Sequence, residues 1–221
     1  MQYFTEDFLE FFKELAANNH KDWFDENRKR YKNSVKDPFD KYVGDLILNI
    51  RKLDARVLIE AKDAVFRINR DIRFSPNKDP YKLDRSAVIS PVGRKDHSVP
   101  GFYLSFGPEK TMFGGGAYFM PPEKLAQARS YIAANPKAFQ KVKDHSEFKK
   151  YFGEIKGEEN KRLPKELQDA AEKEPLLYKK QLYYMAEKEP ELILQDNLMD
   201  ISMDYYRAAR QFQDFLTESM A

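Results

Sequence analysis

The sequence predicts one α+β domain, in which a central antiparallel sheet of about five to six strands is covered by N- and C-terminal helices. Apolar residues recur at helical spacing near both ends of the chain, whereas the middle switches to short β-branched and aromatic runs separated by proline and glycine. No helix-length crossover separates these runs, which favours antiparallel pairing. We expect a single domain over 1–221, with N-terminal helices at about 5–54, the sheet at about 56–120 and C-terminal helices at about 122–219.

The N-terminal part of the chain is predicted to form three helices. Thr5 can cap the first, and Asn18-Asn19 ends it because asparagine tolerates the left-handed turn conformation. A second helix carries Trp23 and Phe24 on its inward side. Asp37-Pro38, a cap followed by proline at the first helical position, begins the third. Its apolar residues recur at spacings of three and four: Phe39, Val43, Leu46, Ile50 and Leu53.

The middle of the chain supplies most of the predicted strands. The hairpin is the clearest part, because Pro108-Glu109-Lys110 can turn one apolar run into the next. In its first strand, three apolar residues alternate with Tyr103 and Ser105, which predicts one buried and one outward face. The predicted strands span 56–60, 65–74, 86–92, 101–106, 111–120 and, later in the chain, 181–185.

Helices resume after Pro121-Pro122. Asn135-Pro136 is expected to end one helix and begin another, and a final helix is expected from about Asp196. The charged stretch 153–174 is expected to be an irregular surface excursion.

Composition restricts the classes of function. Net charge is only +2, from 38 basic and 36 acidic residues, so a global field that would attract nucleic acid or anionic lipid is absent. A sequence pI of about 8.5 with interleaved acids also disfavours a nucleic-acid partner. No cysteine, signal peptide or membrane-length apolar run is present, and we expect a cytoplasmic protein with no membrane association. The three histidines are scattered, so no metal and no cofactor is predicted. Composition does not determine the oligomeric state.

One dense polar segment, 66–82, looks like a site. As a strand, its first half separates an apolar face, expected beneath the helices, from a polar face. Arg70 falls on the apolar side, where we expect it to be buried and paired with a carboxylate, because an unpaired buried charge is too costly. The apolar positions are Phe66, Ile68, Ile72 and Phe74, and the polar ones are Arg67, Asn69, Asp71 and Arg73.

The polar face is suited to an anion. Arg67 and Arg73 flank Asp71, and two guanidinium forks can grip a phosphate or carboxylate bidentately. Asp71 could orient the forks or act as a general base. The following loop adds Ser75, Lys78 and Lys82. Alternatively, the three charged residues of the strand form only an ion-pair ladder on a solvated face.

Gly114-Gly115-Gly116 permits close backbone approach, but it lacks a phosphate-loop pattern. A bulge or a tight bend beside Tyr118 is the preferred interpretation.

These segments together resemble a bacterial family, domain-of-unknown-function family 2461. The resemblance rests on Asn18-Asn19 with Trp23-Phe24, on the unbroken string 66–82, on the glycine-rich strand 114–118 and on Arg129, and it covers nearly the whole chain. It implies signature positions at Arg67, Arg70, Asp71, Arg73, Ser75, Lys78, Tyr81 and Lys82, but it implies no activity. The chain departs from the family near Leu163-Pro164, which puts the role of that loop in doubt.

Two functions follow as hypotheses. The first is a binding module or an enzyme acting on a phosphorylated or other anionic small molecule; the second is a non-enzymatic protein-interaction domain whose arginine ladder is structural. A concave pocket containing the Arg67 face would favour the first, and a flat face with an apolar patch would favour the second. The expected ligand-binding residues are Arg67, Arg73, Ser75, Lys78, Tyr81 and Lys82, supported by Arg70, Asn69, Gly115 and Arg129, with Asp71 as the catalytic candidate if there is a reaction.

Overall fold

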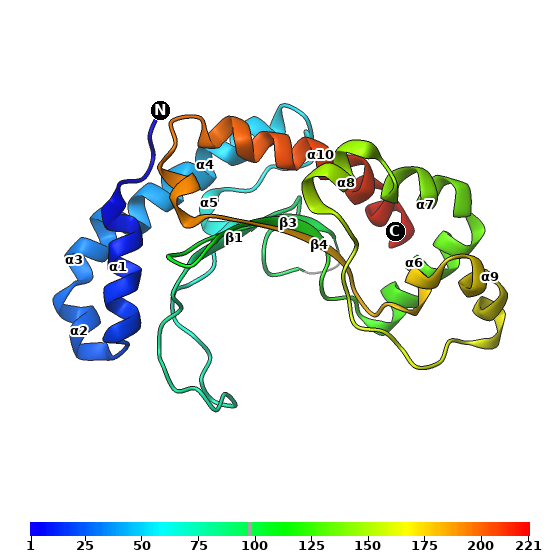
Figure 1. Cartoon of the computed structure of the whole chain (residues 1–221), viewed down its shortest axis with the longest axis horizontal. Helices are drawn as coiled ribbons and strands as arrows, with labels where there is room; N and C mark the ends of the chain where they lie inside the picture. The colour runs from blue at the N-terminus through cyan, green and yellow to red at the C-terminus, as the bar shows by residue number, and fades with distance from the viewer. Residues whose placement is uncertain (97–98) are drawn as a thin grey trace.

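The α+β class is confirmed by a computed structural model, which describes residues 1–96 and 99–221. Helices lie at both ends of the molecule and a sheet lies between them (Figure 1). The sheet has four antiparallel strands in the order β1-β2-β3-β4, so the expectation of five to six was wrong. The strands are β1 (Arg85–Ile89), β2 (Gly101–Phe106), β3 (Thr111–Ala117) and β4 (Leu182–Lys188).

Two expected strands, 56–60 and 65–74, are not strands of this sheet. In the first, the carbonyls of Val57 and Ile59 accept hydrogen bonds from the side chain of Arg51 instead of from a neighbouring strand. The second leaves the sheet after an isolated bridge between Val65 and Ala87. Both segments have strand-like composition, but neither has a partner strand over its length.

The N-terminal helices follow the predicted order. Tyr31–Lys36 is a π-helical segment that runs directly into the next helix, so the helix at Asp37-Pro38 starts without a separate cap. Leu53, expected to point inward, lies beyond the end of that helix and is 36% exposed. The elements are α1 (Glu6–Ala17), α2 (Lys21–Glu26), α3 (Arg28–Arg30), η1 (Tyr31–Lys36), α4 (Asp37–Arg51) and α5 (Ala61–Ala64).

The C-terminal helices break where proline predicts. Asn135 ends one helix and Pro136 begins the next. The expected irregular excursion contains short helical turns and two isolated bridges, from Lys156 to Tyr183 of β4 and from Glu159 to Lys179 before it. The elements are α6 (Pro122–Ala134), α7 (Pro136–Lys143), α8 (Ser146–Phe152), η2 (Lys165–Leu167), α9 (Gln168–Lys173), η3 (Pro175–Tyr178), η4 (Pro190–Leu194) and α10 (Leu198–Ser219).

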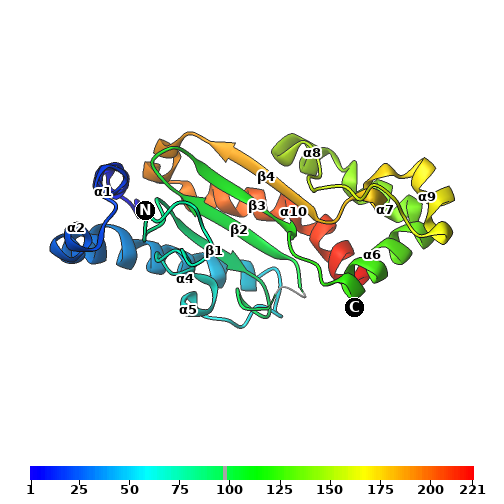
Figure 2. The same cartoon turned by 90° about the horizontal axis from the view of Figure 1, so that it is seen from below.

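One face of the sheet is covered by α4 and α10, as both views show (Figures 1 and 2). Phe113 of β3 is fully buried there, with its ring stacked on Tyr205 of α10 at 4.6 Å between centroids. The predicted alternation in β2 is confirmed, because its three apolar residues lie in this core and Tyr103 does not. The fully buried sheet residues are Phe102, Leu104, Phe106, Phe113 and Tyr184.

The glycine triplet is neither a bulge nor a tight bend. Gly114, Gly115 and Gly116 pair in continuous register with β2 and with β4. A Cβ on Gly114 would lie 2.5 Å from the carbonyl oxygen of Tyr184, and one on Gly115 would lie 2.4 Å from that of Gly101. The triplet therefore allows the central strands to approach more closely than side chains would permit.

Candidate functional site

Residues 66–82 form an arm that leaves the sheet and returns to it (Figure 1). Its two legs are tied together by backbone hydrogen bonds, from Lys82 N to Ile68 O at 2.8 Å and from Arg70 N to Pro80 O at 2.9 Å. Phe74, near the tip, is 93% exposed, and Ile72 is partly exposed. The prediction that this apolar face is buried beneath helices was therefore wrong for Ile72 and Phe74, whereas Ile68 is buried and Phe66 is half-buried near the base of the arm. The alternation is present, but the arm extends away from the helices.

Charged residues of the arm bond to its own backbone and, in Arg73 and Asp71, to each other. Arg73 donates to both oxygens of Asp71, at 3.0 and 2.7 Å, and this bonding lowers the pKa of Asp71 to about 2. A carboxylate of that strength is poorly matched to proton abstraction near neutral pH. Arg70 donates to the backbone carbonyl of Asp79 at 3.3 Å and is partly exposed, so its predicted burial against a carboxylate was wrong.

The tip and the base of the arm are held differently. At the tip, Lys78 donates to the carbonyl of Ile72 at 3.0 Å, and the backbone N–H of Ser75 donates to the same carbonyl at 3.4 Å. At the base, Tyr81 is buried and stacks on Phe24, with 4.1 Å between ring centroids.

The base of the arm joins two of the segments that carry the family resemblance. Asn19 accepts a hydrogen bond from the backbone N–H of Tyr81 and donates one to its carbonyl, at 3.1 and 3.0 Å. The turn after α1 therefore fixes the returning leg of the arm, and Asn69 pairs with Tyr81 from the outgoing leg.

The buried arginine of this region is Arg85, in β1. Its guanidinium donates to the carbonyl of Phe66 at 2.8 Å and lies 3.4 Å from the carboxylate of Asp40, with 4% of the residue exposed. It therefore fixes the point at which the arm leaves the sheet. Arg67 is exposed, and its positive charge lowers the pKa of both Asp71 and Lys82. The structure thus leaves Arg67 and Lys82 near the base of the arm and places Arg73 and Lys78 near its tip.

Arg129, in α6, lies at the other end of the molecule from the arm. It is buried and donates to the carbonyls of Tyr178 and Lys179, at 3.3 and 3.1 Å. The side-chain amide of Asn160, with its oxygen toward the guanidinium, accepts two further hydrogen bonds at 3.1 and 2.8 Å. These contacts tie the loop after α8 to the segment leading into β4.

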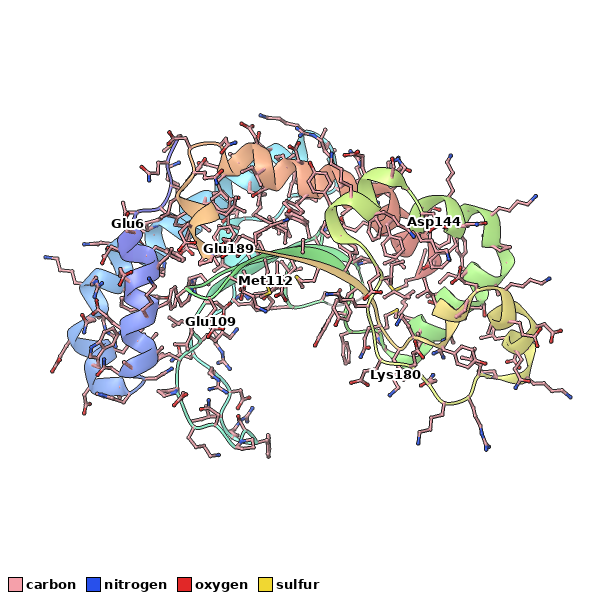
Figure 3. All side chains as sticks on the ribbon, viewed as in Figure 1. Glu6, Glu109, Met112, Asp144, Lys180 and Glu189 are labelled. Atoms are coloured by element: carbon pink, nitrogen blue, oxygen red, sulfur yellow. The ribbon has the colours of Figure 1, made fainter. Side chains whose placement is uncertain are left out.

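A cavity of about 450 Å³ lies on the sheet face opposite α4 and α10. Residues of all four strands form its floor, and Figure 2 shows this face of the sheet from below. Met112, labelled in Figure 3, belongs to this face of β3. Tyr118 and Phe119 are 70% and 60% exposed at its edge. The lining is mainly apolar and aromatic: Phe66, Val88, Val99, Tyr103, Met112, Ala117, Tyr118, Phe119, Tyr183 and Met185, with Ser90, Gly93, Asp96, Gly101, Gly115 and Gly116.

Polar side chains gather beside Phe66 and Tyr103 of this lining. Ser105 donates to Asp84 at 2.8 Å, Tyr103 lies two residues from Ser105 on the same face of β2, and Ser86 of β1 pairs with Ser105. The Lys82 ammonium lies 5.2 Å from the centre of the Phe66 ring. Burial lowers the pKa of Lys82, Asp84 opposes that shift, and Arg85 and Arg67 add to it. The cavity therefore combines an apolar body with a polar end.

Sequence reasoning found only the arm side of this site. Asp84, Tyr103 and the cavity floor were missed, although a signal was present. Lys82, Asp84, Ser86 and Val88 alternate with residues of the covered face, and the outward positions of β2, β3 and β4 include tyrosine and methionine. Tyrosine and methionine at these outward positions make the face more apolar than contact with solvent requires.

Two observations limit the chemistry. No three histidine, aspartate or glutamate side chains cluster so as to hold a metal ion within 1–96 and 99–221. In the same ranges, no helix is both long and apolar enough to cross a membrane.

Comparison with known proteins gives one match. The model of the family described as conserved hypothetical protein (DUF2461) matches residues 7–215, which is nearly the whole chain. No curated protein matches.

Proposed function

Because this chain belongs to the conserved hypothetical protein family DUF2461, its function has to be inferred from its own site, and we propose that it binds a small organic anion with an apolar body in the sheet cavity. The observation that carries this proposal is an apolar cavity of about 450 Å³ on a sheet face, beside a polar end. Ligand sites are typically concave, mostly apolar and of this size, with a few polar groups that fix orientation.

The anionic group would lie at the polar end. Among the described residues, no carboxylate or hydrogen-bond acceptor is bonded to the ammonium of Lys82, and Arg67 adds a second positive charge nearby. In contrast, Arg73 and Lys78 already have partners within the arm. We therefore assign the anion contact to Lys82 and Arg67, and give Arg73, Ser75, Lys78 and Tyr81 the role of holding the arm in place.

The apolar body would lie on the floor between Val88, Met112 and Met185. Gly101, Gly115 and Gly116 also line the cavity and contribute only backbone to it. The exposed rings of Tyr118 and Phe119 would then cover part of the ligand.

A pair of fluorescent probes tests both parts of this proposal. Anilinonaphthalene sulfonate has an aromatic body and an anionic group, and phenylnaphthylamine is its neutral counterpart. Each probe should bind the folded protein at a single site. Val88→Trp should weaken both by at least about tenfold, because the indole fills the floor. Unchanged affinity in this variant would place the probes elsewhere and overturn the proposal.

The anion contact is tested by a matched pair of lysine variants. Lys82→Gln should weaken the sulfonate probe by about tenfold, the effect of losing one charge-assisted hydrogen bond, and should leave the neutral probe unaffected. Lys78→Gln, on the same arm, should change neither. If Lys82→Gln and Lys78→Gln changed the affinity for the sulfonate probe equally, Lys82 would not be the residue that contacts the anion. Folding of each variant is checked by its thermal melt.

A further inference from the structure

Three groups of complementary chemistry lie at or beside the cavity: the phenol of Tyr103, which lines it, the amine of Lys82, which lies against the lining residue Phe66, and the carboxylate of Asp84. Lys82 and Asp84 lie two residues apart on the side of the chain that faces away from the core, since Tyr81 and Arg85 are buried. Tyr103 lies on the same side of the neighbouring strand β2 and lines the cavity itself. The arrangement concentrates an amine and two proton carriers where an apolar cavity ends.

Lys82 differs from the other lysine of the arm. Its ammonium lies against the ring of Phe66, a cavity-lining residue, and none of its bonds within the described residues is to an acceptor oxygen. Lys78, by comparison, is exposed and donates to a backbone carbonyl. Burial lowers the pKa of Lys82, which increases the share of neutral amine at a given pH. A neutral, half-buried amine beside an apolar cavity is the form that attacks carbonyl carbon.

Tyr103 and the carboxylate of Asp84 lie on either side of Ser105. Tyr103 is two residues from Ser105 on the same face of β2, and the Ser105 hydroxyl donates to Asp84 at 2.8 Å. Burial, together with the negative charge of Asp84, raises the pKa of Tyr103, so that its phenol stays protonated and can donate. Asp84 interacts electrostatically with both Lys82 and Tyr103, and it can receive a proton through Ser105.

We propose that Lys82 forms a Schiff base with the aldehyde or ketone carbonyl of a ligand bound in the cavity. The neutral amine attacks the carbonyl carbon, and the carbonyl oxygen takes a proton from Tyr103 to give a carbinolamine. The nitrogen then loses one proton to Asp84, and the protonated Asp84 gives it to the hydroxyl, which leaves as water while a carbon–nitrogen double bond forms. The resulting iminium gives its remaining nitrogen proton to the Tyr103 phenolate, so a neutral imine remains and both groups are restored. The net change is one imine formed and one water released, with no redox partner. This inference rests on the proposed cavity ligand and identifies its class as a carbonyl compound.

Reductive trapping tests the inference on the intact protein. The protein is mixed with carboxybenzaldehyde, which has an aromatic ring, an anionic group and an aldehyde, and then with cyanoborohydride. Peptide mapping by mass spectrometry locates the secondary amine that results. We expect the adduct at Lys82 to form several-fold faster than that at Lys78, and phenylnaphthylamine to suppress it by occupying the cavity. Labelling that is no faster at Lys82 than at Lys78 would overturn the inference, and this measurement requires no variant.

Variants then separate this inference from the binding proposal. Lys82→Arg should abolish the fast adduct, whereas Lys78→Arg should leave its rate unchanged. Tyr103→Phe and Asp84→Asn should slow adduct formation without changing the affinity of the neutral probe, a result that a merely structural role would not give. Probe binding without preferential trapping at Lys82 would reject the Schiff base and leave the proposed function standing. If Val88→Trp left probe affinity unchanged, the probes would not occupy the cavity, and both the proposed function and the Schiff base would be rejected.

Discussion

The two faces of the four-stranded sheet are both largely apolar, but they have different surroundings. The face under α4 and α10 carries phenylalanine and tyrosine packed ring against ring. The opposite face carries Val88, Tyr103, Met112 and Met185, which are partly exposed around a cavity. Burial on the first face stabilises the fold, whereas apolar side chains on the second gain little from folding. The proposed cavity ligand would account for their presence there.

The sharpest test of this contrast uses neighbouring residues of β3. Phe113 points into the core with no exposed surface, and Met112 lies on the cavity face. Phe113→Ala should lower the free energy of unfolding by about 3–5 kcal/mol, from lost transfer energy and the void that remains. Met112→Ala should lower it by less than about 1 kcal/mol, because partly exposed side chains lose less. Urea denaturation measures both, and equal losses would mean that the cavity face is part of the core.

The next largest effect concerns the boundary between the two faces. Arg85 is buried on the covered side of β1, and it holds the carbonyl of Phe66, a wall of the cavity. Arg85→Met should lower the free energy of unfolding by about 1–3 kcal/mol, because the buried carbonyl of Phe66 loses its charged hydrogen-bond donor. Asp40 would keep an ion pair with Lys36 at 2.7 Å, so the larger loss expected when a buried charge is left unpaired does not apply.

Arg70→Met is the matched control for Arg85→Met. Arg70 is partly exposed and donates only to a backbone carbonyl in the arm, so its replacement should change the free energy of unfolding by no more than about 0.5 kcal/mol. A large loss for Arg70→Met and a small one for Arg85→Met would show that the arm, and not the sheet, contains the buried charge.

The sequence predicted the longer helices of both ends, three strands of the central hairpin region and the strand before η4, because these elements are periodic and bounded by proline or asparagine. It missed α5 and α9, which are too short to show a helical period. It failed at 65–74, where the strand-like alternation is real but no neighbouring strand exists over most of its length. Alternation reports which side chains share a face, not whether that face is covered. For the same reason, Arg70 was predicted to be the buried arginine, whereas in the structure the buried arginine is Arg85.

The candidate site was only partly accessible from sequence. Arg67 and Lys82 could be found because they lie in a dense polar segment. The cavity could not, because its lining comes from four strands and from separate residues such as Ser90, Gly93 and Val99, which the sheet register brings together. The charged residues at the tip attracted attention by their density, although Arg73 and Asp71 pair with each other.

A smaller effect is expected where the arm is anchored. Asn19 makes two hydrogen bonds to the backbone of Tyr81, and this contact positions the leg that carries Lys82. Asn19→Ala should lower the free energy of unfolding by about 1–2 kcal/mol. It should also increase the rate of hydrogen exchange at the arm amides more than at the amides of β3. Asn77→Ala, at the exposed tip, should do neither. Uniform exchange throughout the chain of Asn19→Ala would mean that the arm unfolds only with the sheet.

The smallest expected effect is the most informative about the open face, because it concerns the charge of Lys82 alone. Burial lowers the pKa of Lys82 below its ordinary value of 10.5, and the neighbouring charges that act on it are those of Asp84, Arg85 and Arg67. The unfolded chain therefore holds this proton more tightly than the folded protein does. The charged lysine opposes folding at every pH below its folded pKa, and this opposition disappears as the pH rises to 10.5.

Lys82→Met should accordingly increase the free energy of unfolding at neutral pH, and the increase should shrink through the alkaline range toward the ordinary lysine value. Denaturant unfolding of the parent and the variant, measured side by side from neutral to alkaline pH, gives the difference directly. Lys78→Met provides the control, since Lys78 is exposed, and it should show no such convergence. A Lys82→Met variant that is less stable at neutral pH would mean that the ammonium stabilises the fold. Lys82 would then belong with the structural charges of the covered face, and the polar end of the cavity would lose the residue on which both proposals depend.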